Sequence, residues 1–304
     1  IYTLSLHDAL PICCLPRAGA TRWRASRRNG SVNPSRSARP RRWNPWYWDL
    51  PMAALAGMVA IVLLRADETL FLSLNRLSAY TGDGLWANIT VLGDALIALT
   101  LFLALVRRWP DLVWAGLLAG VLTFLFVHGF KHGLSLPRPA SLLSGEQFHI
   151  IGRVLLTRSF PSGHAATAAM VVGVIVLHLS DRGRTWLAAP LLALVGLVGL
   201  SRVVVGAHWP ADVLAGAAGG WLAAVGGMLW ARRWPWGASP AGRRWLTLIL
   251  TACALAALLH YQNGYPQAAA WQRLLASLSL GSMAYQLWTE RRENGRANPE
   301  SGRS

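Results

Sequence analysis

Residues 111–130 read DLVWAGLLAGVLTFLFVHGF, twenty positions with one formally charged side chain, Asp111. A helix advances about 1.5 Å per residue, so roughly 20 apolar residues cover the roughly 30 Å of hydrocarbon in a bilayer. The length and apolar character of this stretch therefore predict a helix that crosses a membrane.

Similar apolar runs lie on both sides of this stretch. With it they form eight predicted spans, at residues 50–65, 89–106, 111–130, 163–180, 186–205, 210–231, 245–260 and 269–288. The whole chain has 54% hydrophobic and 14% charged residues. An ordinary soluble domain has roughly 25% charged residues. The sequence therefore predicts an all-α, polytopic membrane helix bundle.

The beginning of the chain differs from the rest in composition. Residues 1–42 contain no run of span length and become rich in Arg, Ser and Pro from Arg17 onward, so we expect disorder there. The opening IYTLSLHDALPICC lacks the basic region of a signal peptide and is a candidate for a segment foreign to the native product. The remaining predicted regions are a membrane core at 43–231, a loop with two further spans at 232–290, and a polar tail at 291–304.

The arginines predict the orientation of the bundle, because Lys and Arg favour cytoplasmic loops. With eight spans and both termini inside, the cytoplasmic side receives Arg41, Arg42, Arg107, Arg108, Arg182, Arg184, Arg232, Arg233, Arg243, Arg244, Arg291 and Arg292. This placement predicts a multi-pass membrane protein with both termini cytoplasmic, and the membrane that we expect is the bacterial inner membrane. The formal charge of +16 does not indicate a nucleic-acid partner, since these arginines stand at span ends rather than on one soluble face.

Two polar stretches fall on the opposite, outer side. Lys131 and Arg138 follow the third span, a place where basic side chains also simply extend to the membrane interface. Residues 159–164, SFPSGH, lead into the fourth span. Pro161 suits a helix start, whose free N–H groups attract anions, and Gly163 lets an oxyanion approach the backbone. These features favour a phosphate-binding site.

The connection between the fifth and sixth spans adds a histidine and a carboxylate. Residues 201–212 read SRVVVGAHWPAD, so Asp212 follows His208 by four positions and the two side chains can meet. A carboxylate on one imidazole nitrogen leaves the other free to attack. Alternatively, Asp212 only complements the helix dipole. With His164, the outer side collects three cations, two histidines and one carboxylate.

These stretches resemble the signature of the type 2 phosphatidic acid phosphatase family, K-x6-RP, PSGH and SR-x5-H-x3-D. Every defined position is matched, at residues 131–139, 161–164 and 201–212. The resemblance covers residues 50–231 and implies a six-span phosphatase core. Two predicted spans after it lie outside that core.

The resemblance implies a role for each signature residue. His208 is the nucleophile that forms a phosphohistidine, Asp212 orients it, and His164 protonates the leaving oxygen and then activates water. The phosphate is held by Lys131, Arg138, Ser162, Gly163 and Arg202. The implied substrate is a lipid phosphomonoester or pyrophosphate, such as undecaprenyl pyrophosphate, phosphatidylglycerol phosphate, phosphatidic acid or a lipid A phosphate.

We expect no metal and no cofactor, because the sequence offers no carboxylate cluster for Mg²⁺ and no cysteine–histidine pattern for zinc. Beyond the lipid and the bilayer we predict no protein partner. Two other classes of function stay open. Vanadium-dependent haloperoxidases share the constellation but are soluble, and a non-enzymatic lipid transporter or scaffold would use buried charge without chemistry.

Overall fold

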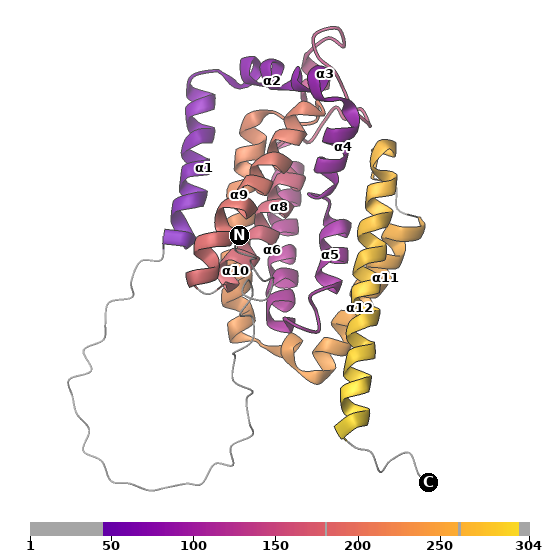
Figure 1. Cartoon of the computed structure of the whole chain (residues 1–304). Coiled ribbons are helices and arrows are strands. Elements are labelled where there is room, and N and C mark those ends of the chain that lie inside the picture. The colour runs from indigo at the N-terminus through magenta and orange to yellow at the C-terminus, as the bar shows by residue number, and fades with distance from the viewer. Residues whose placement is uncertain (1–44, 180, 261–262, 298–304) are drawn as a thin grey trace, which may run out of the picture. The chain divides into compact units, whose positions relative to one another are not determined.

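The computed structural model describes residues 45–179, 181–260 and 263–297, and every regular element within them is helical. The all-α fold is thereby confirmed (Figure 1). The predictions for residues 1–42 lie outside the described residues. The α-helices are α1 Pro45–Leu63, α2 Asp67–Asn75, α3 Leu77–Thr81, α4 Asp83–Val91, α5 Ala95–Leu103, α6 Pro110–Leu134, α7 Pro139–Leu142, α8 Gly163–His178, α9 Asp181–Val204, α10 Pro210–Arg233, α11 Pro240–Leu259 and α12 Ala269–Ala297. Two short 3₁₀ turns are η1 Trp236–Ala238 and η2 Pro266–Ala268.

All eight predicted spans coincide with helices, but the count of eight is too high by length and composition. Within the described residues, five helices are long and apolar enough to cross a bilayer: α1, α6, α9, α10 and α11. Helix α8 has 16 residues, fewer than the roughly 20 that a span needs, and is largely buried between its neighbours. Helix α12 continues to Ala297, so the predicted tail begins as helix, and no stretch of span length within α12 is apolar enough to add it to this set.

The second predicted span, 89–106, is wrong as one continuous helix. The helix is interrupted between α4 and α5, whose axes meet at 62°. If this bent pair is counted as one span, the number of spans rises from five to six. Asp94 causes the restart, because its extended backbone and its carboxylate, bonded to Leu96 N at 2.8 Å and Ile97 N at 3.2 Å, cap α5. A Cβ on Gly93 would stand 2.8 Å from the His164 carbonyl oxygen, so the break lets the chain pass close to His164.

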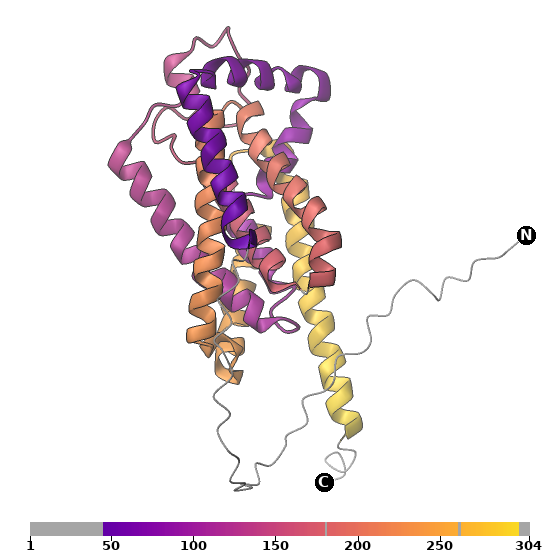
Figure 2. The same ribbon diagram turned by 90° about the vertical axis from the view of Figure 1, so that its left-hand side faces the viewer.

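Helix α10 is the central element and packs against α1, α6 and α8 (Figures 1 and 2). Its contact with α8 is made through small residues, which let two helix backbones approach closely in a membrane. A Cβ on Gly216 would lie 2.3 Å from Ser162 O, and one on Gly220 would lie 2.0 Å from Ala166 O. This close packing holds the PSGH stretch against the start of α10.

The two C-terminal helices, α11 and α12, pack against α5 on the side of the bundle away from α1 (Figure 1). An ion pair between Arg107 and Glu290 links α12 to the connection between α5 and α6. The predicted C-terminal pair is therefore an integral part of the bundle rather than a separate domain.

Candidate active site

The candidate site is built around His208, which precedes the start of α10. Asp212 lies in the first turn of that helix, and its Oδ2 is 3.3 Å from His208 Nδ1. The same oxygen accepts hydrogen bonds from Ser159 Oγ at 2.5 Å and Trp209 N at 3.1 Å. Both members of the pair are buried, with 2% of His208 and 4% of Asp212 exposed. The predicted contact between them is present, and the carboxylate does more than complement the helix dipole.

This geometry assigns the two nitrogens of His208. Nδ1 faces a carboxylate and carries the proton, whereas Nε2 lies 3.2 Å from Arg138 Nη1 and accepts from it. Burial lowers the pKa of His208 well below its ordinary value, and the positive charges of Arg138 and Arg202 lower that pKa further. The ring is therefore neutral at pH 7, with the Nε2 lone pair directed toward the cations.

Lys131 and Arg138 donate to backbone carbonyls of the connection before α8, and Arg138 also donates to one in the connection before α10. Arg138 donates through Nε to Thr157 O at 2.8 Å, through Nη2 to Arg158 O at 3.2 Å, and through Nη1 to Ala207 O at 2.6 Å. Lys131 Nζ donates to Arg158 O at 2.6 Å. These contacts place two positive charges before any ligand binds, which lowers the reorganisation that anion binding requires.

Arg202 lies in the last turn of α9 and is 2% exposed. Its Nη1 donates to Thr90 Oγ1 at 2.6 Å and to the Tyr265 hydroxyl at 2.7 Å. Its Nε is buried and has no hydrogen-bond partner among the described residues. A buried donor without a partner is uncommon in folded proteins and is a candidate for ligand contact.

The PSGH stretch forms the N-terminus of α8. The helix begins at Gly163, the residue at which the predicted span 163–180 begins, with Ser162 as its N-cap. The Ser162 amide donates to Asp212 O at 2.9 Å, which joins this helix start to the start of α10. A Cβ on Gly163 would meet only Val127 Cγ1, at 3.6 Å, so protein packing does not explain the glycine. Open space at a helix N-terminus suits an oxyanion.

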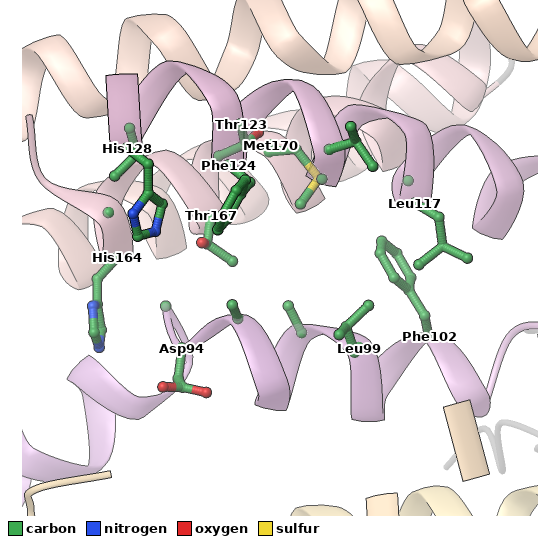
Figure 3. Close-up of a pocket in the computed structure, with 18 residues that line it drawn as sticks. Asp94, Leu99, Phe102, Leu117, Thr123, Phe124, His128, His164, Thr167 and Met170 are labelled. Carbon is green, nitrogen blue, oxygen red and sulfur yellow. The ribbon is translucent and has the colours of Figure 1, made fainter. Parts of the chain in front are cut away.

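His164 opens onto a cavity of about 510 Å³ between α5, α6 and α8 (Figure 3). His164, Asp94 and His128 lie toward one end, and Phe102 and Leu117 lie toward the other (Figure 3). The wall between them is mostly apolar, and the lining also includes Ala98, Leu99, Gly116, Gly120, Val121, Thr123, Phe124, Val127, Thr167 and Met170. The sequence contained no signal for this cavity, because helices far apart in the chain form its sides.

The structure brings the predicted site residues together around the imidazole ring of His208. The charges of Lys131, Arg138 and Arg202 all act on His208, as does His164. Ser162 and Gly163 join the group through the contact between α8 and α10. Sequence reasoning missed Ser159, Thr90 and Tyr265 as partners. Ser159 stands within the quoted SFPSGH stretch, whereas the other two lie in segments without a motif.

A family model described as the PAP2 superfamily matches residues 111–236, which contain all three signature stretches. This segment belongs to the PAP2 superfamily. The family resemblance expected from the motifs is thereby confirmed, and the five long apolar helices agree with a membrane protein. The PAP2 segment runs from α6 to η1, so α1 to α5, α11 and α12 lie outside the matched residues.

Curated proteins similar to this chain include two from different organisms. The lipid A 1-phosphatase of Rhizobium etli is 34% identical over 133 residues, which are 41% of this chain and 49% of that protein. The undecaprenyl-diphosphatase of Sulfolobus acidocaldarius is 26% identical over 58% of this chain and 87% of that protein. The chain thus spans about half the length of the rhizobial relative. Among solved structures, Aquifex aeolicus LpxE has a TM-score of 0.49 and 27% identity, over 54% of this chain and 94% of that one.

Proposed function

We propose that this chain is a lipid phosphatase that works through a phosphohistidine on His208 and needs no metal. The observation that carries the proposal is the buried His208, with Nδ1 on Asp212 and Nε2 facing Arg138. The two curated relatives described above bear the names of phosphatases that act on lipids. The three cations near His208 outnumber its bonded carboxylate, so the site favours a phosphate dianion.

In the first step, the Nε2 lone pair of His208 attacks phosphorus and the bond to the lipid oxygen breaks. An incoming phosphate takes over the hydrogen bond from Arg138 Nη1, which frees that lone pair. Lys131, Arg138 and Arg202 hold the three equatorial oxygens, where charge accumulates during transfer. His164, which the negative charge of the bound phosphate keeps protonated, gives its proton to the leaving oxygen, and Asp212 stabilises the positive charge on the His208 ring.

In the second step, water attacks the phosphorus of the phosphohistidine. Neutral His164 now accepts a proton from that water, and the bond between phosphorus and Nε2 breaks. The electron pair returns to Nε2, inorganic phosphate leaves, and His208 is neutral again. His164 ends protonated, so both histidines recover their starting states.

The cavity beside His164 supports a lipid as the substrate. Its apolar wall extends between α5 and α6, away from the end where His164 lies (Figure 3). The cavity volume of about 510 Å³ accommodates part of a hydrocarbon chain. A substrate bound in this way keeps its phosphate at the two histidines and its tail against apolar side chains. Undecaprenyl pyrophosphate and lipid A phosphates are our leading candidates, with phosphatidylglycerol phosphate and phosphatidic acid as the further members of the test set.

Purified protein is expected to release phosphate from at least one of these four lipids in the presence of excess EDTA. The chain's own cations supply the charge that a metal would otherwise provide, so chelation should change the initial rate by less than about twofold. Phosphate release is measured by colorimetry with each lipid in mixed micelles. Activity that disappears with EDTA and returns with Mg²⁺ would contradict metal independence, and no release from any lipid would contradict the proposed class.

Filling the cavity should reduce activity on lipids more than on small phosphates. Gly120 lines the cavity on α6, and a Cβ there meets only Met170 Cε at 3.9 Å, so Gly120→Leu projects into the cavity without a backbone clash. We expect kcat/KM for a long-chain lipid to fall about tenfold, because the leucine side chain occupies space in the cavity and the lipid tail loses part of its apolar contact. Release from a water-soluble short-chain phosphate should change less than twofold.

Gly129→Leu on the same helix is the matched control, since a Cβ at Gly129 has no atom within 4 Å and the residue is exposed outside the cavity. Equal losses for the two variants, or equal losses for long and short substrates, would show that the cavity does not hold the tail.

We further infer that the site faces the outside of a bacterial inner membrane. The arginines at the α5–α6 connection and at the end of α10 lie at the end of the bundle opposite the site (Figure 1). Lys and Arg favour the cytoplasmic side, which leaves the site outside. In a cysteine-free background, Ser144→Cys on the site side should react with an impermeant maleimide in intact spheroplasts, whereas Ala241→Cys at the start of α11 should react only after lysis. The reverse pattern would overturn this orientation.

A further inference from the structure

Tyr265 lies in the connection between α11 and α12, beyond the PAP2 segment, and is 7% exposed. Its hydroxyl accepts a hydrogen bond from Arg202 Nη1 at 2.7 Å, and its ring centroid is 5.8 Å from the guanidinium carbon. A residue from the C-terminal helix pair therefore contacts one of the three cations of the site directly.

The contacts of Arg202 leave one part of its guanidinium available. Nη1 donates to both Thr90, which precedes α9 in the sequence, and Tyr265, which follows it. Nε, in contrast, has no hydrogen-bond partner among the described residues. A guanidinium is planar and rigid, so fixing Nη1 also fixes the direction of its other N–H groups. The two acceptors thus determine where the unpaired donor points.

Tyr265 is itself held by contacts on both sides. Its amide donates to Asn263 Oδ1 at 2.8 Å, and Asn263 Nδ2 donates to Gln272 Oε1 at 2.8 Å. Gln272 Nε2 donates to Ala257 O at 2.6 Å, which connects α12 to α11. On the other side the ring lies against Gly152, where a Cβ would come within 2.8 Å of it. These contacts leave the hydroxyl little freedom to move away from Arg202.

We propose that Tyr265 is a positioning residue through which the α11–α12 pair sets Arg202 for phosphate binding. The proposal rests on the proposed function, because it takes Arg202 as a ligand of the transferred phosphate. It gives the two helices beyond the PAP2 segment a role in the chemistry of the site. Thr90, near the end of α4, accepts from the same Nη1 and so helps to position the arginine.

Tyr265→Phe tests this role, because it removes the hydroxyl and keeps the packed ring. A hydrogen bond to a charged group is usually worth about a tenfold change in an equilibrium constant or more. We expect KM for the lipid and the inhibition constant of orthovanadate, a phosphate analogue, to rise together by about tenfold. The melting temperature and the concentration of titratable active sites should stay at the wild-type values. Tyr285→Phe, on exposed α12 surface, is the control and should change neither constant.

A double-mutant cycle with Arg202→Lys separates positioning from a general structural effect. A lysine at 202 cannot keep the planar fork, so adding Tyr265→Phe to it should change the vanadate constant by less than about twofold. An unchanged vanadate constant in Tyr265→Phe, or a loss of active sites without a change in either constant, would overturn the proposal while wild-type activity stands. Wild-type protein that releases no phosphate and binds no vanadate would instead overturn the proposed function.

Discussion

Replacing His208 by alanine is expected to reduce phosphate release from lipid substrates by roughly 10⁴-fold or more, the scale seen when a covalent nucleophile is removed. The reason is geometric. His208 Nε2 is the lone pair that faces the cations, and no other described residue combines a carboxylate on Nδ1 with an arginine on Nε2. Initial rates with the preferred lipid measure the effect, and membrane insertion and melting temperature should match those of wild type.

The covalent intermediate provides a second readout for His208. Wild-type protein that is mixed with ³²P-labelled lipid phosphate and quenched in alkali should retain label, since a phosphohistidine survives base and is lost in acid. His208→Ala should retain none. His260→Ala, which removes an exposed histidine outside the site, is the control and should behave as wild type. Labelled His208→Ala, or turnover near the wild-type rate in it, would show that another group attacks phosphorus.

Replacing His164 by alanine should produce a different defect that depends on the leaving group. Loss of a general acid typically costs 10² to 10⁴ in rate, so we expect a fall of about 10³-fold for a lipid whose leaving group is an alcohol. The p-nitrophenolate of p-nitrophenyl phosphate leaves without protonation, so the first step with this substrate should be nearly unaffected. Its second step still needs a base for water, so the phosphoenzyme should accumulate.

The predicted signature of His164→Ala is therefore a burst of p-nitrophenol, about one per active site, followed by slow turnover, measured by rapid mixing. Thr167→Ala is the matched control, because this residue lines the same cavity on α8 beside His164 (Figure 3). It should retain steady turnover. A His164→Ala protein that loses the same factor with both kinds of leaving group and shows no burst would contradict the assignment of acid and base.

The membrane spans show that an apolar run predicts where a helix forms but not where that helix is interrupted. Runs such as 111–130 and 210–231 became the long helices α6 and α10, because in lipid a helix satisfies every backbone group internally. The run 89–106 is also apolar enough for a span, yet its helix breaks before α5. Asp94 caps a helix there, and Gly93 permits close contact with His164. Hydropathy averages over such a pair, so the break could not be predicted from it.

Within the site, the spacing of residues along the sequence predicted only the contacts between side chains that lie within one helical turn of each other. Asp212 meets His208 because four positions separate them at the start of a helix, and the PSGH stretch begins a helix at Gly163. The contacts between stretches depend on packing instead. Ser159 reaches Asp212 across 53 positions of sequence, and Arg138 reaches His208 across 70.

The sequence by itself determined long membrane helices such as α6 and α10, the three motifs and the residue types of the site, since these depend on composition and on neighbours along the chain. The tertiary structure decided how the motifs meet. Close approach of α10 to α8 at Gly216 joins two of them, and the break before α5 opens the cavity beside His164. It also brought Tyr265 and Thr90 to Arg202, because long-range hydrogen bonds depend on which helices pack together and have no local signature.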